Sequence, residues 1–338
     1  MLRPVFSAML ITGLAITTLA AQNDRRINNM ISRQDSDKDG KISKQEWRWR
    51  KENFDKIDIN KDGYITADEL QKSLSGLRRP VDADIIKNVT YATVGGKKML
   101  LDIYMPKNSK KPPVLLVWIH GGGWRNGSKN NVNRSFLDLV KEGYAVASID
   151  YQLLGVPGIP QITYECKSAI RFLRANAKKY GYNADRIGIG GSSAGGHLVL
   201  LLGTSGGVKK LEGEVGGNLD QSSSVQAVVD FFGPSDMLTQ PKVKQQLTNK
   251  VFIEFARLIS PVVYVDKNDP PLLIYHGTAD RTVPIQQSRI IYDKYKELGL
   301  EVTKHEIEGA GHGFKPAELP PDKATKEMKE FFDKHLLK

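Results

Sequence analysis

Residues 186–203 read "RIGIGGSSAGGHLVLLLG": a strand-like apolar run, a glycine-rich turn and a helix-like apolar run in direct succession. The pattern Gly-x-Ser-x-Gly fits this turn in one register, which makes Ser193, and not its neighbour Ser192, the candidate nucleophile. The glycines leave room for a turn too tight for side chains beside the serine. The start of the following helix favours negative charge near the hydroxyl. The stretch therefore predicts a strand–turn–helix unit that presents a reactive serine.

A second glycine-rich segment, "HGGGW" at 120–124, directly follows the apolar run "VLLVWI". Backbone N–H groups can converge on an oxyanion only where side chains are absent, so glycines suit this task. We expect the donors to be Gly122, Gly123 and Ala194. The competing interpretation, a phosphate-binding loop, lacks the Gly-Lys-Ser/Thr that such loops need.

Two later loops offer an acid and a base. "HGTADRTVP", 276–284, places Asp280 after an apolar run, and "GAGHGF", 309–314, places His312 after the last strand-like run. Of the six histidines, His312 alone combines such a loop with an upstream acid. The resulting chain order is Ser193, Asp280, His312, and a Ser-x-x-Lys alternative is absent from the sequence.

From about residue 88, short β-rich runs alternate with helix-like segments. Several runs are continuously apolar, as in sheets covered on both faces. We therefore expect an α/β fold with a doubly wound, mostly parallel sheet. The expected strands are 88–94, 99–105, 114–120, 144–150, 186–191, 227–233, 271–277 and 302–309. The expected helices are 165–180, 194–203, 285–298 and 323–336.

Residues 88–338 resemble the α/β-hydrolase family of hormone-sensitive-lipase-like and feruloyl or acetyl-xylan-esterase-like serine esterases. The motifs that carry the resemblance are "LDIYMP", "WIHGGGW", "SIDYQLL", "ECKSAIRFLR", "DRIGIGGSSAGGHL", "FFGPSD" and "HGTADRTVP". The resemblance implies an α/β-hydrolase fold, Ser193, Asp280 and His312 as catalytic triad, and oxyanion donors within 121–123. It also implies ester substrates, with acetyl or feruloyl groups on polysaccharides expected.

Two stretches upstream, "DSDKDGKISKQE" and "DINKDGYITADE", match the twelve-residue EF-hand loop that binds calcium through oxygen atoms. Each has its glycine at position 6 and its glutamate at position 12, and Ile42 and Ile65 are placed to pair between the loops. Residues 47–57 leave room for one helix shared by the loops. The expected ligands, side chains except for two backbone carbonyls at Lys41 and Tyr64, are Asp35, Asp37, Asp39, Lys41, Glu46, Asp58, Asn60, Asp62, Tyr64 and Glu69.

These features predict four segments: a signal peptide at 1–21, a small all-α EF-hand pair at 22–78, a linker at 79–87 and the catalytic domain at 88–338. The signal peptide is suggested by Arg3, the apolar run 5–19 and the small residues ending at Ala20. That run is shorter than the ~20 residues that span a bilayer. The single cysteine, Cys166, excludes an internal disulfide. We expect a secreted or periplasmic protein without a stable membrane insertion.

The charge of the chain indicates which kinds of binding partner to expect. The net charge is +11, but the lysines and arginines are scattered and no nucleic-acid-binding motif accompanies them. We therefore expect an ester substrate and calcium as partners, and no nucleic acid. Two alternatives stay open: a serine peptidase of the prolyl-oligopeptidase type, and a calcium-dependent binding protein whose hydrolase domain is inert.

Overall fold

The computed structural model describes residues 27, 29–48, 51–70, 81–240, 249–315 and 317–337. Contacts divide the chain into two units, Met1–Pro80 and Val81–Lys338. The expected signal peptide, residues 71–78 of the expected EF-hand pair and the first two residues of the linker lie outside the described residues. No helix in the described ranges is both long and apolar enough to cross a bilayer.

The N-terminal unit is built around two short strands, β1 (Ile42–Ser43) and β2 (Tyr64–Ile65), which pair antiparallel. Ile42 lies opposite Ile65, as the sequence predicts, and both side chains are fully buried. Helix α2 (Lys51–Ile57) joins the two loops and packs Phe54 edge-to-face on Trp47, with ring centroids 5.7 Å apart. These contacts tie the loops into one small core.

The helix expected at 47–57 is shorter than predicted. Trp47 and Arg48 are not helical, and the described helix begins at Lys51. The backbone N–H of Arg48 donates to Oε1 of Gln34 at 2.7 Å, so this amide is bound outside the helix. The small sheet also means that the unit is not purely α-helical.

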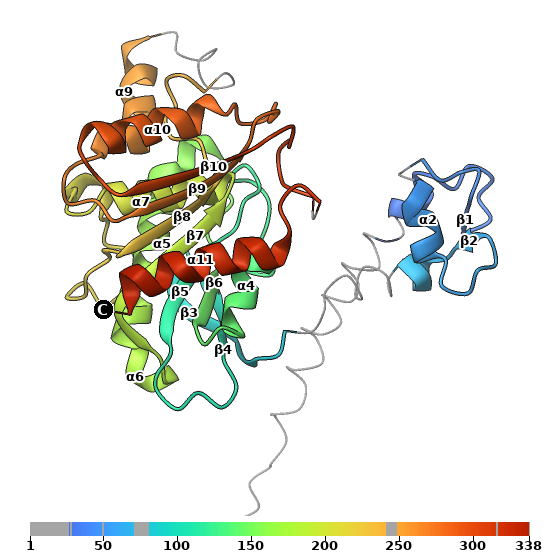
Figure 1. Ribbon diagram of the computed structural model, residues 1–338, viewed down its shortest axis with the longest axis horizontal. Coiled ribbons are helices and arrows are strands. Elements are labelled where there is room, and N and C mark those ends of the chain that lie inside the picture. Colours follow the sequence, from blue (N-terminus) through green and yellow to red (C-terminus); the bar gives the residue numbers. More distant parts are fainter. Residues whose placement is uncertain are drawn as a thin grey trace, which may run out of the picture. The chain divides into compact units, whose positions relative to one another are not determined.

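The second unit contains an eight-stranded sheet of order β10-β9-β8-β7-β5-β6-β4-β3 (Figure 1). Strand β4 pairs antiparallel with β3 and β6, and all other neighbours are parallel. Every strand expected from the sequence is present, so the mostly parallel sheet is confirmed. The strands are β3 (Asp84–Val94), β4 (Lys97–Met105), β5 (Val114–Ile119), β6 (Ala145–Ile149), β7 (Asn183–Ser192), β8 (Ala227–Phe231), β9 (Leu272–Gly277) and β10 (Val302–Ile307).

Residues 84–87, expected as part of the linker, belong to β3. This edge strand has exposed side chains over its first residues, which gives it the polar pattern of a linker. Its backbone nevertheless pairs with β4 from Asp84 onward, opposite Met105.

Helices cover both faces of the sheet (Figure 1). Apolar residues of α5, α7 and α10 share one core with the sheet, and those of α4 and α11 share another. The expected helix 165–180 begins earlier and is broken at Asn176, while α9 was not expected. The α-helices are α4 (Arg134–Leu137), α5 (Ile159–Ala175), α6 (Ala177–Tyr180), α7 (Ala194–Thr204), α9 (Lys250–Leu258), α10 (Gln286–Glu297) and α11 (Pro321–Leu336). The 3-10 helices are η1 (Asp138–Val140), η2 (Val156–Gly158), η3 (Lys209–Leu211) and η4 (Pro261–Tyr264).

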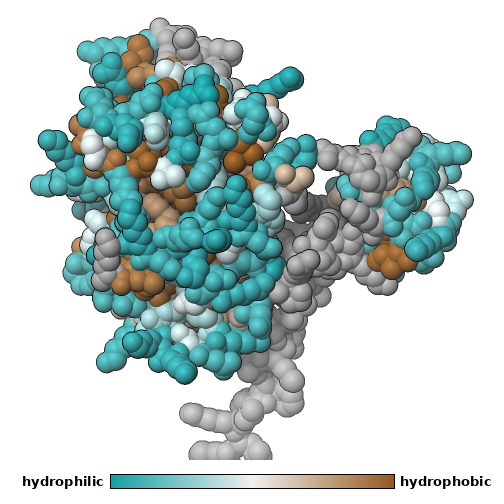
Figure 2. All heavy atoms as spheres, viewed as in Figure 1, coloured by the Kyte–Doolittle hydropathy of each residue, from teal (hydrophilic) through white to brown (hydrophobic). Residues whose placement is uncertain are grey.

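With helices on both faces of the sheet, polar side chains lie on the surface of the unit. Figure 2 shows a mainly hydrophilic surface on this face of the unit, with hydrophobic residues in small groups. Inside, strands β5 and β9 are almost wholly buried, which explains their continuous apolar sequences. Because β5, β7, β9 and β10 are parallel, their carboxyl ends meet at one edge, where ligands bind in open α/β sheets.

Candidate active site and cation-binding loops

Ser193 occupies a strained turn between β7 and α7. Its φ of 55° and ψ of −116° are values that non-glycine residues rarely adopt. The turn is packed against the end of β5: a Cβ at Gly195 would lie 2.0 Å from the carbonyl oxygen of Ile119. Only glycine fits there, which explains the glycine-rich sequence around the serine.

Ser193, His312 and Asp280 form a continuous line of hydrogen bonds. Nε2 of His312 lies 3.0 Å from Oγ of Ser193, and Nδ1 lies 2.7 Å from Oδ2 of Asp280. Because a carboxylate only accepts, Nδ1 carries the proton and Nε2 presents its lone pair to the serine hydroxyl. This tautomer is the one that a general base acting on Ser193 requires.

Asp280 is held by more groups than His312 alone. Its Oδ1 accepts the backbone N–H groups of Thr282 and Val283, at 2.7 and 2.9 Å. Nε2 of His276 lies 3.5 Å from Oδ2. Although burial opposes ionisation, the hydrogen bonds from these histidines and amides lower the pKa of Asp280 well below its usual range. The carboxylate therefore stays charged at neutral pH.

His276 has a larger part in the site than the sequence indicates. Its ring is fully buried; Nε2–H donates to the carbonyl of Val283 at 2.8 Å, and Nδ1 accepts from the Ser288 hydroxyl at 2.6 Å. The histidine thereby fixes the loop that carries Asp280. Its position four residues before Asp280 was the only sequence signal of this role.

The neighbouring serine and the other histidines lie apart from this line. Ser192 ends β7 and lines a different cavity. His197 is buried in α7, where desolvation lowers its pKa to about 4 and Nε2 donates to the carbonyl of Ile259. His305 lies in β10 and His335 in α11, as expected. Burial also lowers the pKa of His120, which stacks on Tyr151.

Two of the three expected oxyanion donors, Gly123 and Ala194, line the cavity of the serine, and the third, Gly122, precedes Gly123 in the chain. Gly122 and Gly123 follow β5 with φ of 119° and 62°, and Ala194 is the first residue of α7. Among the described residues, none of their backbone N–H groups donates to a loop or side-chain acceptor. Gly123, Ala194 and Ser193 line one cavity of about 330 Å³. The arrangement offers free donors next to the hydroxyl, as an oxyanion hole requires.

A second cavity, of about 470 Å³, lies beside the His312 loop. Ser192, Phe232 and Phe314 contribute to its walls. The ring of Phe232 is 4.7 Å from that of His312 and 5.3 Å from that of Phe314. Phe232 has a φ of 47°, a second strained residue at the site. The catalytic line is therefore flanked by two cavities, one lined by Ser193 and Ala194 and one with aromatic walls.

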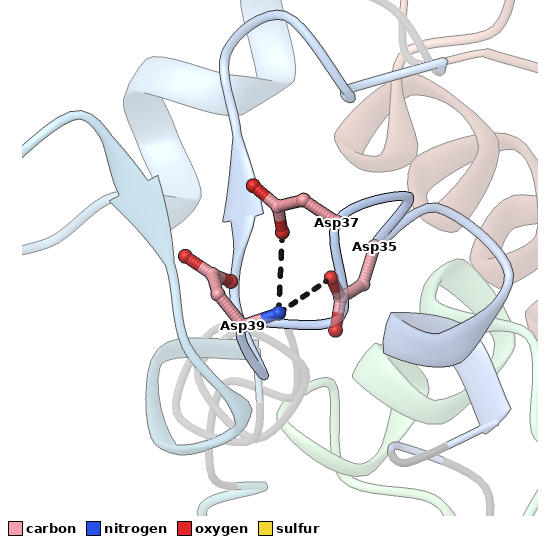
Figure 3. A group of neighbouring side chains, drawn as sticks. All are labelled: Asp35, Asp37 and Asp39. Atoms are coloured by element: carbon pink, nitrogen blue, oxygen red, sulfur yellow. Dashed lines mark hydrogen bonds between the residues drawn. The ribbon is translucent and has the colours of Figure 1, made fainter.

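The first of the two expected calcium loops brings three acids together (Figure 3). Carboxylate oxygens of Asp35, Asp37 and Asp39 all lie within 4.8 Å of one another. The backbone N–H of Asp39 donates to the Asp35 and Asp37 carboxylates, at 3.2 Å each. Gly40, with a φ of 82°, allows the sharp turn that follows. The last expected ligand, Glu46, accepts the amides of Ser43 and Ser36, and these bonds lower its pKa to about 2.

The second loop repeats this arrangement. The backbone N–H of Asp62 donates to Asp58 and Asn60, and Gly63 has a φ of 85°. Glu69 accepts the amides of Ile59 and Thr66, at 3.1 and 3.0 Å. Two loops of the same sequence pattern thus adopt the same local structure.

The donor set fits calcium. In both loops, carboxylate and amide side chains surround a turn that contains a glycine with positive φ. Calcium prefers six to eight oxygen ligands at flexible distances. The carbonyl of Lys41 lies directly before β1 and that of Tyr64 lies in β2, at the positions where the EF-hand supplies a backbone ligand. No group of softer chemistry, such as a thiol or imidazole, stands among the expected ligands.

Known proteins are similar to the second unit in both fold and sequence. Esterase LipC of Mycobacterium tuberculosis is 32% identical over 64% of this chain and 57% of LipC. A solved carbohydrate esterase from gut microbiota, in truncated form, superposes with a TM-score of 0.68 at 32% identity, over 77% of this chain and 99% of that one. Esterase Est2 of Thermogutta terrifontis superposes with a TM-score of 0.64 at 26% identity, over 75% of this chain and 94% of that one. The chain spans about half the length of the curated relatives it matches.

Family models divide the chain in the same way. The EF-hand model matches residues 33–48 and 52–75, which include both cation-binding loops. The BD-FAE model matches residues 101–295, more than half of the chain, and contains the strands that present Ser193 and Asp280. The sheet order and the strand–turn–helix at the serine are those expected of an α/β-hydrolase, in agreement with this match. The chain belongs to the BD-FAE family of α/β-hydrolases and carries an EF-hand pair.

Proposed function

We propose that this protein is a serine carboxylesterase that works through an acyl-enzyme. The observation that supports this proposal most directly is the hydrogen-bonded line Ser193–His312–Asp280 beside the free donors of Gly123 and Ala194. Relatives named as esterases add to it.

The geometry suggests the steps. His312 Nε2 takes the proton of the Ser193 hydroxyl while Oγ attacks the ester carbonyl, and the carbonyl oxygen becomes an oxyanion bound by backbone N–H groups. The C–O bond to the alcohol then breaks, and His312 gives its proton to the departing oxygen. Water repeats the sequence, with His312 again as base, and releases the acid and Ser193. Asp280 stays ionised throughout and stabilises the imidazolium.

The proposed substrates are acetyl or feruloyl esters on polysaccharides. Support comes from the similarity to a carbohydrate esterase and from the aromatic cavity. Phe232 and Phe314 offer flat apolar surfaces on which a sugar ring or an aromatic acid can pack.

The proposal includes calcium on the EF-hand loops and export from the cytoplasm. Calcium would be held by the carboxylates and carbonyls of 35–46 and 58–69 and would supply structural stability. Calcium is plentiful outside cells, so sites of modest affinity would be filled there. Export itself rests on the N-terminal sequence pattern alone.

Two alternatives make different predictions. A peptidase of the prolyl-oligopeptidase type would cleave proline-containing peptides faster than esters. A binding protein with an inert hydrolase domain would bind its ligand in a calcium-dependent way with no turnover of any ester. The complete hydrogen-bonded line argues against the second alternative.

The test is hydrolysis of p-nitrophenyl esters of rising acyl length, together with acetylated xylan, methyl ferulate and a proline-containing peptide amide. The Ser193→Ala protein, purified in the same way, sets the background. Turnover of short acyl esters well above this background is the expected result. No turnover of any ester, with the protein folded, would overturn the proposal.

A further inference from the structure

The cavity beside Ser193 contains an amide side chain with no partner. Gln240 lines this cavity together with Ser193, Ala194 and Gly123, and only 6% of its surface is exposed. Its Oε1 is enclosed without a hydrogen bond, and none is recorded for its Nε2 within the described residues. A buried amide without partners costs free energy, so natural proteins seldom keep one without a reason.

A second unpaired polar group lines the same cavity. Trp124, next to the oxyanion glycines, is 8% exposed, and its Nε1–H is buried without an acceptor among the described residues. Its ring meets His197 edge-to-face, at 5.3 Å between centroids, which fixes the indole. The cavity wall therefore holds an indole donor and an amide that can both donate and accept.

The turn that carries Gln240 is held rigidly. Oε1 of Gln287, on α10, accepts the backbone N–H groups of Ser235 and Asp236, at 2.9 and 2.8 Å. Nε2 of Gln287 donates to the Thr239 hydroxyl at 3.0 Å, directly before Gln240. The Gln240 backbone N–H donates to the carbonyl of Asp236 at 3.1 Å, so the backbone that carries this side chain is fixed before a ligand binds.

The unpaired polar groups of Gln240 and Trp124 could both form hydrogen bonds with a hydroxyl group. A hydroxyl donates one hydrogen bond and accepts others, so it pairs with Gln240 in either orientation of the amide and with the Trp124 donor. An apolar acyl chain would leave these groups unpaired, and such sites discriminate strongly against ligands that lack the polar group.

We propose that Gln240, assisted by Trp124, selects esters that carry a hydroxyl group able to enter the cavity beside Ser193. The inference rests on the proposed esterase function and narrows its substrate class. The hydroxyl has two chemical sources: the alcohol, as in a monoacetylated sugar, or the acyl group, as in a phenolic acid. Gln240 acts here as a specificity-determining residue and takes no part in bond breaking.

The experiment uses two matched pairs of esters with the full-length protein. Cyclohexyl acetate and trans-2-hydroxycyclohexyl acetate differ by a hydroxyl on the alcohol. Methyl cinnamate and methyl 4-hydroxycinnamate differ by a hydroxyl on the acyl group. The readout is the ratio of kcat/KM for the hydroxylated ester to that for its plain partner, in the wild type and in Gln240→Met, which keeps an unbranched side chain of similar length without hydrogen bonds.

In the wild type the ratio should exceed about fivefold in at least one pair, and Gln240→Met should lower it about fivefold or more. The pair that responds identifies the source of the hydroxyl. Gln161→Met is the matched control, since Gln161 lies on α5 beside a different cavity, and it should keep the wild-type ratios. Thermal melting verifies that both variants are folded.

Equal ratios in wild type and Gln240→Met for both pairs would overturn the inference while leaving the esterase function intact. Absence of turnover for all four esters and for the p-nitrophenyl esters would instead overturn the esterase proposal, and this inference with it. A ratio that changes as much in Gln161→Met as in Gln240→Met would show a general effect of glutamine loss and would also refute the assignment.

Discussion

Nδ1 of His312 lies 2.7 Å from Oδ2 of Asp280, and the other oxygen of this carboxylate accepts two backbone amides from its own loop. The acid is thus fixed independently of the histidine that it orients. Because these bonds depress the pKa of Asp280, the carboxylate cannot share the proton of His312 at neutral pH. Its contribution is orientation and a constant negative charge.

Replacing Asp280 by Asn should therefore lower kcat on p-nitrophenyl acetate by about 10⁴-fold. The amide –NH₂ can face Nδ1 and hold His312 in the tautomer whose Nε2 carries the proton, which cannot act as base. Steady-state kinetics at pH 7 and 8 measure the effect. A loss smaller than about tenfold would mean that another group orients the histidine.

The two adjacent serines should behave very differently. Ser193→Ala removes the hydroxyl that contacts His312 and should reduce kcat by at least about 10⁴-fold. Ser192→Ala changes a residue that lines the aromatic cavity, so we expect kcat/KM within about tenfold of the wild type. Esterase assays on both variants decide the point, and the reverse outcome would contradict the assigned register.

The sheet and the catalytic line were predictable because their sequence signals are local. Continuous apolar runs marked the strands, and glycines with tight neighbours, such as Gly195, marked the turns. Helix α9 and the role of Gln240 were not predictable. Much of α9 is exposed in spite of its apolar residues. The turn before Gln240 is held by Gln287, which lies 47 positions later in the sequence than Gln240. Contacts of that kind depend on packing and leave no pattern in the chain.

Gly195→Ala should destabilise the catalytic unit. The added methyl group would lie 2.0 Å from the carbonyl oxygen of Ile119 and 2.6 Å from that of His120, so the turn or the end of β5 must shift. We expect a loss of about 1–3 kcal/mol in the free energy of unfolding. Activity should fall as well, since the same turn carries Ser193. Denaturant titration and esterase assays measure both effects.

Gly206→Ala is the matched control. Gly206 follows α7, its φ is outside the left-handed region, and a Cβ there meets nothing within 4 Å. Its free energy of unfolding should stay within about 0.5 kcal/mol of the wild type. Equal effects of the two substitutions would show that crowding at Gly195 is not the cause.

The buried carboxyl group of Asp230, near the end of β8, should make the stability of the catalytic unit depend on pH. Burial raises the pKa of its carboxyl to about 7, Oδ1 accepts the Gly233 amide, and Oδ2 has no partner among the described residues. Because the folded-state pKa exceeds the unfolded value of about 3.9, ionisation destabilises the folded state progressively between those values. Asp230→Asn removes this penalty, so its melting temperature relative to wild type should rise from pH 5 to pH 8. A constant difference would contradict the buried, uncompensated carboxylate.

The last prediction concerns calcium. Ester cleavage by Ser193 and His312 has no step that needs a metal, and every expected metal ligand lies before residue 70. Removing calcium with a chelator should therefore lower the melting temperature of the N-terminal unit and leave kcat on p-nitrophenyl acetate within about twofold. Binding to the folded state alone stabilises it by mass action, about 2.7 kcal/mol at a hundredfold excess over Kd.

The Glu46→Gln variant tests whether the stabilisation by calcium comes from binding at the first loop or from a general effect of salt. Glu46 is the one bidentate ligand expected in the first loop, so its loss should weaken calcium binding there by about tenfold or more. Calorimetric titration with calcium measures the affinity, and magnesium at equal ionic strength is the control. Unchanged calcium affinity in Glu46→Gln would refute the ligand assignment. A large, calcium-reversible loss of turnover while the catalytic unit stays folded would instead mean that the EF-hand pair acts on ester cleavage.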